Sequence, residues 1–200
     1  MRAPGLCWGI EARFQGLVFG VDEVGRGPWA GPVTAAAVCL SAEDVPAGLG
    51  DSKVVPERMR DAIAAQIGRR AIAEASVEEI DRLNIRAATL LAMTRAIQAL
   101  AAQVGAPAMV LIDGNMLPDI AFPARAIVKG DACVASIAAA AIVAKVHRDA
   151  LMRSLAETHP GYGWERNKGY GTADHAAGLA RFGVTAHHRR SFKPVAKLLG

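Results

Sequence analysis

The sequence predicts an α/β domain whose helices pack around one mixed β-sheet. Two features of the pattern favour this class: short apolar runs typical of strands, and segments with helical spacing of apolar residues that alternate with them along the chain. At 200 residues, with 52% hydrophobic and 21% charged residues, the chain suits one globular domain with a sizeable core. Because it contains no repeat, low-complexity segment or interdomain linker, we expect residues 17–200 to form a single domain.

The first half of the chain holds three expected strands and two helices. Residues 17–23 and 30–40 are apolar runs joined by a glycine-rich loop, as two neighbouring strands would be. Pro56 opens a helix that runs to about residue 67, since proline is favoured in the first turn of a helix. A strand is expected over residues 71–77 and a helix over 80–103, with a capping box formed by Ser76 and Glu79 between them.

The second half adds two short strands and a long helix. The strands are expected over residues 109–112 and 126–128, and the alanine-rich segment from Asp131 to about Glu157 forms the helix. Its small side chains would let this helix lie unusually close to the sheet. Residues 159–171 form a loop rich in glycine, aromatic and basic residues. A helix over residues 173–182 and a short C-terminal helix complete the domain.

Composition limits where the protein works. Residues 1–16 lack the apolar core of a signal peptide, and we expect them to be a poorly ordered N-terminal extension instead. No apolar stretch reaches the roughly 18 residues of a membrane span, so we expect no membrane association. Cys7, Cys39 and Cys133 are odd in number and form no disulfide framework, which favours a reducing cytoplasm. Nothing in the sequence demands more than a monomer.

The net charge of +4 is concentrated in the C-terminal fifth of the chain. From His159 onward there are seven Lys or Arg against two Asp or Glu, whereas the preceding residues are close to neutral. A clustered basic surface favours polyanions, nucleic acid above all. Aromatic residues lie among these charges as base-stacking side chains would, although a solvated charged tail is the plain alternative. They are Tyr162, Trp164, Tyr170 and Phe192. We expect the pair His187 and His188 to belong to the same basic surface, and His175 to be a cap or surface residue.

Acidic residues interrupt the apolar runs where three strands are expected to end. Asp22 and Glu23 end the first strand, Asp113 follows residues 109–112, and Asp131 follows residues 126–128. Ligand sites in open α/β sheets gather at strand ends, so we expect these carboxylates to converge. Such a cluster needs a divalent cation, and hard oxygen ligands without paired His or Cys indicate Mg²⁺ or Mn²⁺ rather than Zn²⁺. Two such ions can activate a water and stabilise the leaving oxygen in phosphodiester cleavage.

Each acid also has a purely structural alternative. Asp113 begins an ordinary Asp-Gly-Asn turn sequence, and Asp131 stands where a helix N-cap would. Asp22 and Glu23 cannot both face one side of a regular strand, so one lies beyond the ladder or Glu23 reaches a metal differently. Directly after them, the glycines of Gly25-Arg26-Gly27 would let backbone N–H groups approach a phosphate or a sugar.

Ten short segments, spread over roughly residues 17–195, occur in the same order as in a known protein family. The segments are Gly20-Val-Asp-Glu-Val-Gly-Arg-Gly-Pro28, Asp51-Ser52-Lys53, Leu111-Ile-Asp-Gly-Asn115, Val128-Lys-Gly-Asp131, Ser136-Ile-Ala-Ala-Ala, Ala144-Lys145-Val146, Arg148-Asp149, His159-Pro160, Lys168-Gly-Tyr-Gly-Thr172 and His187-His-Arg-Arg-Ser-Phe192. Together they closely resemble bacterial ribonuclease HII, the type 2 ribonuclease H family.

The resemblance implies a ribonuclease H-like fold with a helical C-terminal part. It implies an endonuclease that cuts the RNA strand of RNA–DNA hybrids and nicks duplex DNA 5′ of an embedded ribonucleotide, in DNA replication and repair. Two-metal-ion catalysis with Mg²⁺ or Mn²⁺ would leave 5′-phosphate and 3′-hydroxyl ends.

The same resemblance assigns roles by position. Asp22, Glu23, Asp113 and Asp131 correspond to the family's four catalytic, metal-binding acids. The loop Gly25-Arg26-Gly27 corresponds to the segment that senses the ribose 2′-OH, the group that separates RNA from DNA. Tyr170 corresponds to the tyrosine that stacks on the following deoxyribose, and Lys53 and Lys168 to further substrate-binding positions.

Small departures from the family pattern leave the four acids untouched. Asn167 stands where many members have His, and Ala141 where they have a small polar residue. Ribonuclease HIII normally carries Gly-Thr-Gly and an added N-terminal domain, so Arg26 and the short leader argue against it. The residues alone also allow two other functions. One is a nucleic-acid-binding module without catalysis, and the other is another Mg²⁺-dependent phosphoryl-transfer enzyme such as an integrase or resolvase.

Overall fold

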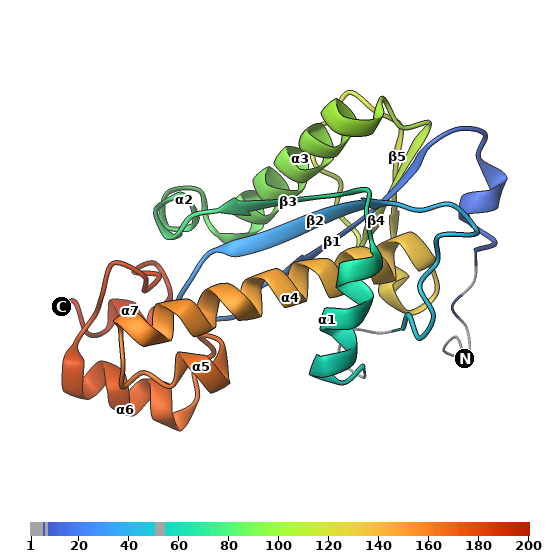
Figure 1. Cartoon of the computed structure of the whole chain (residues 1–200). Coiled ribbons are helices and arrows are strands. Elements are labelled where there is room, and N and C mark those ends of the chain that lie inside the picture. The colour runs from blue at the N-terminus through green and yellow to red at the C-terminus, as the bar shows by residue number, and fades with distance from the viewer. Residues whose placement is uncertain (1–5, 7, 51–54) are drawn as a thin grey trace.

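One mixed sheet forms the centre of the molecule in the computed structural model, which describes residues 6, 8–50 and 55–200 (Figure 1). Within these residues the sheet has five strands in the order β3-β2-β1-β4-β5. The pairs β1–β2 and β2–β3 are antiparallel, whereas β1–β4 and β4–β5 are parallel. The strands are β1 (Val18–Val24), β2 (Val33–Cys39), β3 (Arg70–Ala75), β4 (Met109–Asp113) and β5 (Ala124–Ile127). The predicted α/β class with a mixed central sheet is therefore confirmed.

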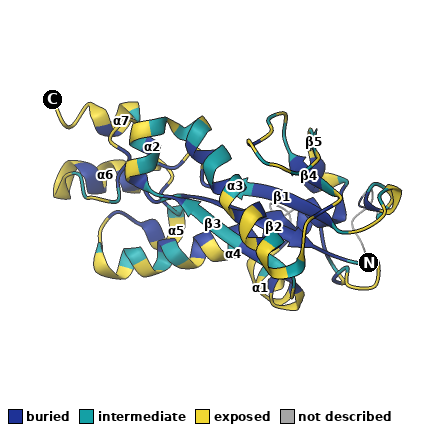
Figure 2. Ribbon diagram, turned by 90° about the horizontal axis from the view of Figure 1, so that it is seen from above, coloured by how far each residue is buried: buried dark blue, intermediate teal, exposed yellow. Residues whose placement is uncertain are grey.

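Helices cover both faces of this sheet. Helices α2 and α3 lie on one face and α1 and α4 on the other, while α5, α6 and α7 gather at the C-terminal end of α4 (Figure 1). The helices are α1 (Glu57–Gln66), α2 (Val77–Leu83), α3 (Ile85–Val104), α4 (Ala135–Thr158), α5 (Trp164–Asn167), α6 (Ala173–Phe182) and α7 (Lys193–Ala196), with 3₁₀ turns η1 (Glu11–Arg13) and η2 (Gly130–Ala132). The central strands β1, β2 and β4 are largely buried between these layers, the edge strands β3 and β5 are mostly half-buried, and the helices expose their outer sides (Figure 2).

Helix α3 is the one described helix that is long and apolar enough to cross a membrane by length and composition. Its buried side, which includes Ala88, Ala92 and Ile97, packs into the same cluster as Phe19 and Val21 of β1. The apolar content of α3 is thus accounted for by the protein core.

Small residues bring α4 directly against the centre of the sheet, as its composition predicts. A Cβ placed on Gly20 of β1 would lie 2.1 Å from the carbonyl carbon of Ser136 and 2.4 Å from the nitrogen of Ile137. Residues 138–141 are four consecutive alanines, all buried. Because α4 begins against β1, the turn that precedes it is held beside the end of that strand.

Several strand ends shift by one to three residues from the sequence prediction, and three differences are larger. The helix expected over 80–103 is two helices, because Asn84 has a positive φ of 71° and its side chain caps α3 at the N–H groups of Arg86 and Ala87. Helix α4 begins at Ala135 rather than at Asp131, with η2 before it. The loop expected over residues 159–171 contains the short helix α5. The capping box of Ser76 and Glu79 is present as predicted.

The described part of residues 1–16 is packed rather than poorly ordered. Glu11 is buried, and its Oε1 accepts hydrogen bonds from the backbone N–H and the hydroxyl of Ser136, at 2.8 and 3.0 Å. A carboxylate at this point also favours the positive end of the α4 dipole. Ile10 and Phe14 pack on the apolar cluster around Val18.

The C-terminal region has its own core, which corrects the expectation of stacking residues. Tyr162 and Trp164 are buried with Met152 and Leu179, and therefore present no ring to a nucleic acid. Tyr170 is different, because 45% of its surface is exposed.

Two histidines of this region are also buried rather than superficial, whereas His187 is half-buried. His175 and His188 are fully buried, and their Nε2 atoms lie 3.0 Å apart. The Nδ1 of His188 accepts from the backbone N–H of Thr185, so its Nε2 carries the proton and donates to His175. The Nε2 of His175 also accepts from the indole N–H of Trp164, and its Nδ1–H donates to the carbonyl of Tyr170. This network holds the backbone at Tyr170 in place.

Candidate active site

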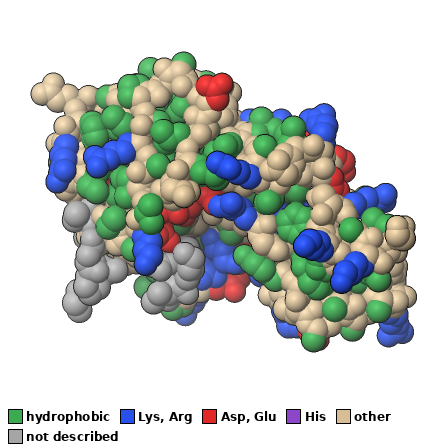
Figure 3. Space-filling model, turned by 180° about the vertical axis from the view of Figure 1, so that it is seen from behind, with side chains coloured by type: hydrophobic (Ala, Val, Ile, Leu, Met, Phe, Trp, Pro, Cys, Tyr) green, Lys and Arg blue, Asp and Glu red, His purple; other side chains and the backbone are tan. Residues whose placement is uncertain are grey.

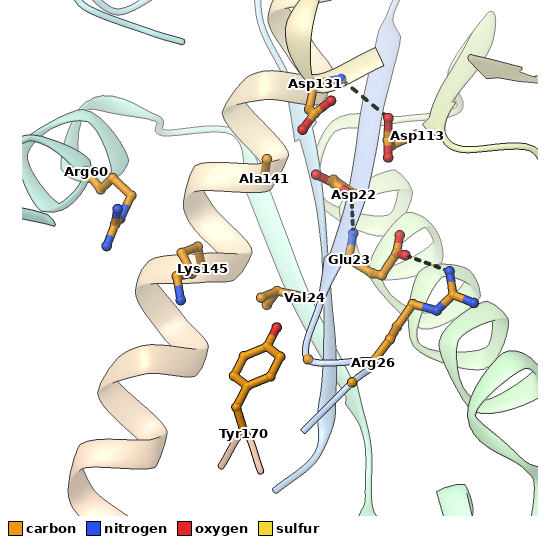
Figure 4. A pocket seen from close by; sticks show the side chains of 12 residues that line it. Asp22, Glu23, Val24, Arg26, Arg60, Asp113, Asp131, Ala141, Lys145 and Tyr170 are labelled. Atoms are coloured by element: carbon orange, nitrogen blue, oxygen red, sulfur yellow. Dashed lines mark hydrogen bonds and ion pairs between the residues drawn. The ribbon is translucent and has the colours of Figure 1, made fainter. Parts of the chain in front are cut away.

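A cleft of about 600 Å³ opens where strands β1 and β4 end, and all four predicted acids line it (Figure 4). Asp22 and Glu23 come from β1, Asp113 is the last residue of β4, and Asp131 lies in η2. The pairing of β4 with β1 reaches only Ile112 opposite Val21. Beyond that point the edge of β1 is open, which exposes the two acids to the cleft.

Asp22 and Glu23 reach the cleft from opposite faces of the sheet. Both stay within the β1–β2 ladder, opposite Ala36 and Ala35 respectively. Ala36 belongs to the cluster on the α4 side and Ala35 to the cluster on the α3 side. The question that the sequence leaves open is thus settled: neither acid lies beyond the ladder, and Glu23 approaches around the open strand edge.

Asp113 joins the end of β4 to the turn that carries Asp131. Its Oδ1 accepts from the backbone N–H of Gly130 at 2.7 Å and from that of Asp131 at 3.4 Å. The alternative that Asp131 caps α4 is wrong, since the N-cap position is Val134. A Cβ on Gly130 would meet the terminal methyl group of Ile137 at 2.6 Å, so a larger residue there would force this buried side chain to move.

The carboxylates repel one another. Burial raises the pKa of Asp22 well above its usual value, and the charges of Glu23, Asp113 and Asp131 raise it further. Burial and Asp113 also raise the pKa of Glu23, and the guanidinium of Arg26, 3.3 Å away, opposes this shift. The four carboxylates therefore need additional positive charge to offset their mutual repulsion.

The donor set fits Mg²⁺ or Mn²⁺ by its chemistry. All four groups are hard carboxylate oxygens, and their mutual repulsion is what a divalent cation would relieve. Among the described residues, no three His, Cys, Asp or Glu side chains close around one point as a complete cage. Mg²⁺ does not require one, because it typically keeps several waters and binds one or two carboxylates together with substrate phosphate oxygens.

Cations form the wall opposite the acids (Figure 4). Lys145 of α4 and Arg60 of α1 line the cleft, and Asp149 supports both: its Oδ1 lies 2.8 Å from Lys145 Nζ, and its Oδ2 lies 4.0 Å from Arg60 Nη2. The sequence alone does not distinguish a phosphate contact from a solvated role for Lys145. Arg60 gave no signal, because α1 reads as an ordinary polar surface helix. Seen from behind, acidic side chains occupy a hollow near the middle of the molecule with Lys and Arg around it (Figure 3).

The predicted substrate loop lies in the same cleft as the acids. Gly25, Arg26, Gly27 and Tyr170 all line it, and a Cβ on Gly27 would be 3.4 Å from the ring of Tyr170. Lys168 does not line the cleft, and its ammonium group donates to the carbonyl of Glu165. Lys53 is outside the described residues, so its role stays a prediction.

The sheet order, the flanking helices and the acids at the ends of β1 and β4 define a ribonuclease H-like protein. Solved structures agree on the fold. The ribonuclease H2 of Pyrococcus horikoshii OT3 superposes with a TM-score of 0.74, covering 91% of this chain and 96% of that one at 21% identity. Bst-RNase HIII in complex with Mn²⁺ has a TM-score of 0.78, covering 98% of this chain and 73% of that one at 21% identity.

Within that class, the chain belongs to the ribonuclease HII family. The family model for ribonuclease HII matches residues 19–195. The ribonuclease HII of Jannaschia sp. (strain CCS1) is 61% identical over 194 residues, which cover 95% of this chain and 96% of that protein. Membership of this family makes the chain a nuclease of the hydrolase class.

Proposed function

We propose that this protein is an endoribonuclease that hydrolyses the RNA strand of RNA–DNA hybrids and nicks duplex DNA on the 5′ side of an embedded ribonucleotide. The proposal rests on the observation that one cleft contains two groups of residues with different chemistry. Four carboxylates lie beside a glycine-flanked loop and an exposed tyrosine. The carboxylates suit phosphodiester chemistry, and the loop with the tyrosine suits recognition of a ribose.

The carboxylates Asp22, Glu23, Asp113 and Asp131 would hold two Mg²⁺ or Mn²⁺ ions. When bound, such ions supply an activated water and stabilise the leaving oxygen. Addition of the water oxygen to phosphorus and cleavage of the bond to the 3′ oxygen leave a 5′-phosphate and a 3′-hydroxyl end. Lys145 and Arg60 face the acids across the cleft and would contact the phosphates of the bound strand.

Recognition of the ribose falls to the loop Gly25-Arg26-Gly27. Its backbone N–H groups can approach a 2′-OH closely, because the flanking glycines carry no side chain. Tyr170 would stack on the next sugar, which its exposure in the cleft permits. A binding module without catalysis is the weaker candidate, since clustered, partly buried acids disfavour a polyanion when no cation accompanies them.

The cellular setting is a further part of the proposal, and the cysteine pattern supports its cytoplasmic location. A protein of this activity would remove ribonucleotides during DNA replication and repair, in the cytoplasm and as a monomer. The sequence leaves open which protein partners the enzyme has.

The test uses a labelled DNA duplex with one ribonucleotide, incubated with the protein in Mg²⁺, Mn²⁺ or EDTA. We expect a single metal-dependent nick immediately 5′ of the ribonucleotide and none on the all-DNA duplex. Cleavage of both duplexes would favour an integrase- or resolvase-like enzyme. Tight binding without a nick in either metal would contradict the nuclease function.

A further inference from the structure

Two fully buried arginines surround the loop that joins β1 to β2. Arg189 lies between α6 and α7, and Arg148 lies in α4, yet both side chains end beneath residues 25–32. Neither forms an ion pair with any carboxylate of the described residues. A buried charge without a counter-ion is costly, so another set of partners must compensate it.

Backbone carbonyl groups are those partners. Arg189 donates to four of them: Gly25 at 2.5 Å, Arg26 at 3.0 Å, Gly31 at 2.9 Å and Pro32 at 3.1 Å. The guanidinium is planar and presents five N–H donors in fixed directions, so one side chain can bind both ends of the loop. A lysine at this position would keep the charge but lose the planar arrangement of several N–H donors.

Arg148 ties the same loop to the C-terminal region. It donates to the carbonyls of Ala30 and Pro32, both at 3.0 Å, and to that of Lys168 at 2.9 Å. Gly25 lies directly on this guanidinium, because a Cβ there would be 2.1 Å from Arg148 Nε, and its φ is +91°. The positions of the loop and of the segment before Tyr170 are therefore set by one side chain.

The carbonyl contacts determine where the loop's N–H groups point. In a planar trans peptide, the carbonyl of one residue and the N–H of the next point in opposite directions. Arg189 holds the carbonyls of Gly25 and Arg26 toward the interior, which turns the N–H groups of Arg26 and Gly27 outward, on a loop that lines the cleft. Among the described residues, neither N–H donates to another protein group.

We propose that Arg189, with Arg148, is a positioning residue for ribose recognition. It presents the N–H groups of Arg26 and Gly27 to the 2′-OH of the substrate without touching the substrate itself. The inference rests on the proposed function, and it extends that function to two residues that lie outside the cleft lining. Because the N–H groups are oriented before the substrate arrives, binding does not have to order them.

The test compares Arg189→Lys with Arg190→Lys, its exposed neighbour, as a matched control. Binding of a fluorescent duplex with one ribonucleotide and of the all-DNA duplex is measured in EDTA, where no cleavage occurs, and nicking is measured in Mg²⁺. We expect Arg189→Lys to lower kcat/KM for nicking by roughly 10²-fold, the cost of a misplacement of about 1 Å. It should also lower the preference for the ribonucleotide duplex and leave all-DNA affinity unchanged, whereas Arg190→Lys should match the wild type.

An unchanged binding preference and nicking rate in Arg189→Lys would overturn the positioning role. Absence of nicking by the wild type would instead contradict the proposed function, so the two failures are distinguishable. Should Arg189→Lys not fold, the wild type still provides a test through ¹⁵N relaxation of the Arg26 and Gly27 amides. Rigid amides that shift with the ribonucleotide duplex and not with all-DNA duplex support the proposal, and order parameters below roughly 0.6 refute it.

Discussion

Replacement of Gly20 by alanine tests whether the contact between β1 and α4 builds the active site. The added Cβ would lie 2.1 Å from the carbonyl carbon of Ser136 and 2.4 Å from its oxygen. These are backbone atoms of a helix, so no side chain can rotate away. To bring the nearest atom from 2.1 Å to the 3.4 Å at which ordinary contacts begin, strand and helix must separate by about 1.3 Å.

Such overpacking costs roughly 3 kcal/mol, the upper end for an inserted methyl group. For a protein of this size that lowers the urea midpoint by about 1 M, since the slope of unfolding is near 2–3 kcal/mol per M. Asp22 lies two residues beyond Gly20, and η2 with Asp131 lies just before α4, so the separation also pulls the acids apart. We expect nicking to fall by roughly 10²-fold, as for a misplacement of about 1 Å.

Urea unfolding followed by circular dichroism, together with the nicking assay, measures both effects. The control is Gly68→Ala, because a Cβ on this exposed glycine would meet nothing within 4 Å. We expect it to change stability by less than about 0.5 kcal/mol. Equal urea midpoints for Gly20→Ala and Gly68→Ala would refute the reasoning that small residues set the distance between sheet and helix.

Three further substitutions test the site itself. Asp113→Asn should lower nicking by at least roughly 10²-fold while the protein stays folded, because an amide oxygen can still accept from Gly130; normal Mg²⁺-dependent activity would contradict the assigned role. Tyr170→Ala should reduce cleavage at a ribonucleotide more than it weakens binding to plain DNA, since its ring lines the cleft; equal losses in the two assays would argue against recognition of the junction. Asp22→Asn should raise stability at pH values above the raised pKa of Asp22, because that raised pKa means that the charged form destabilises the fold. The gain should shrink as pH falls below the raised pKa and vanish near the ordinary pKa of an aspartate, and added Mg²⁺ should stabilise the wild type more than the variant; a gain that instead grows toward acid pH would show that the sign is wrong.

Several elements follow from local pattern alone. The capping box at Ser76 and the helix over residues 173–182 are present as predicted, because caps and helical spacing act between residues three or four positions apart. The strand that delivers Asp22 and Glu23 was recognisable because an apolar run that ends in acids is unusual. The break at Asn84 was missed, since helical spacing of apolar residues continues through it.

The fate of individual charged and aromatic residues did not follow from local pattern. Trp164 and His188 stand in a basic, aromatic segment, which favoured a nucleic-acid surface, yet both are buried in the C-terminal core. Lys145 and Arg60 belong to different helices and face the acids through tertiary contacts: Asp149 pairs with both, and Arg60 also donates to the carbonyl of Val55.

By itself the sequence determined the α/β class, the strands that carry the acids, the four carboxylates and the loop beside them. These are properties of short segments, and their residue types restrict the chemistry. Only the tertiary structure decided that Glu23 reaches the cleft around the open edge of β1, and that Arg148 and Arg189 are interior. The carbonyls that bind Arg189 lie 157 to 164 residues before it. The charged side chain of Arg189 can be buried because distant chain segments supply its hydrogen bonds, and no local pattern records that supply.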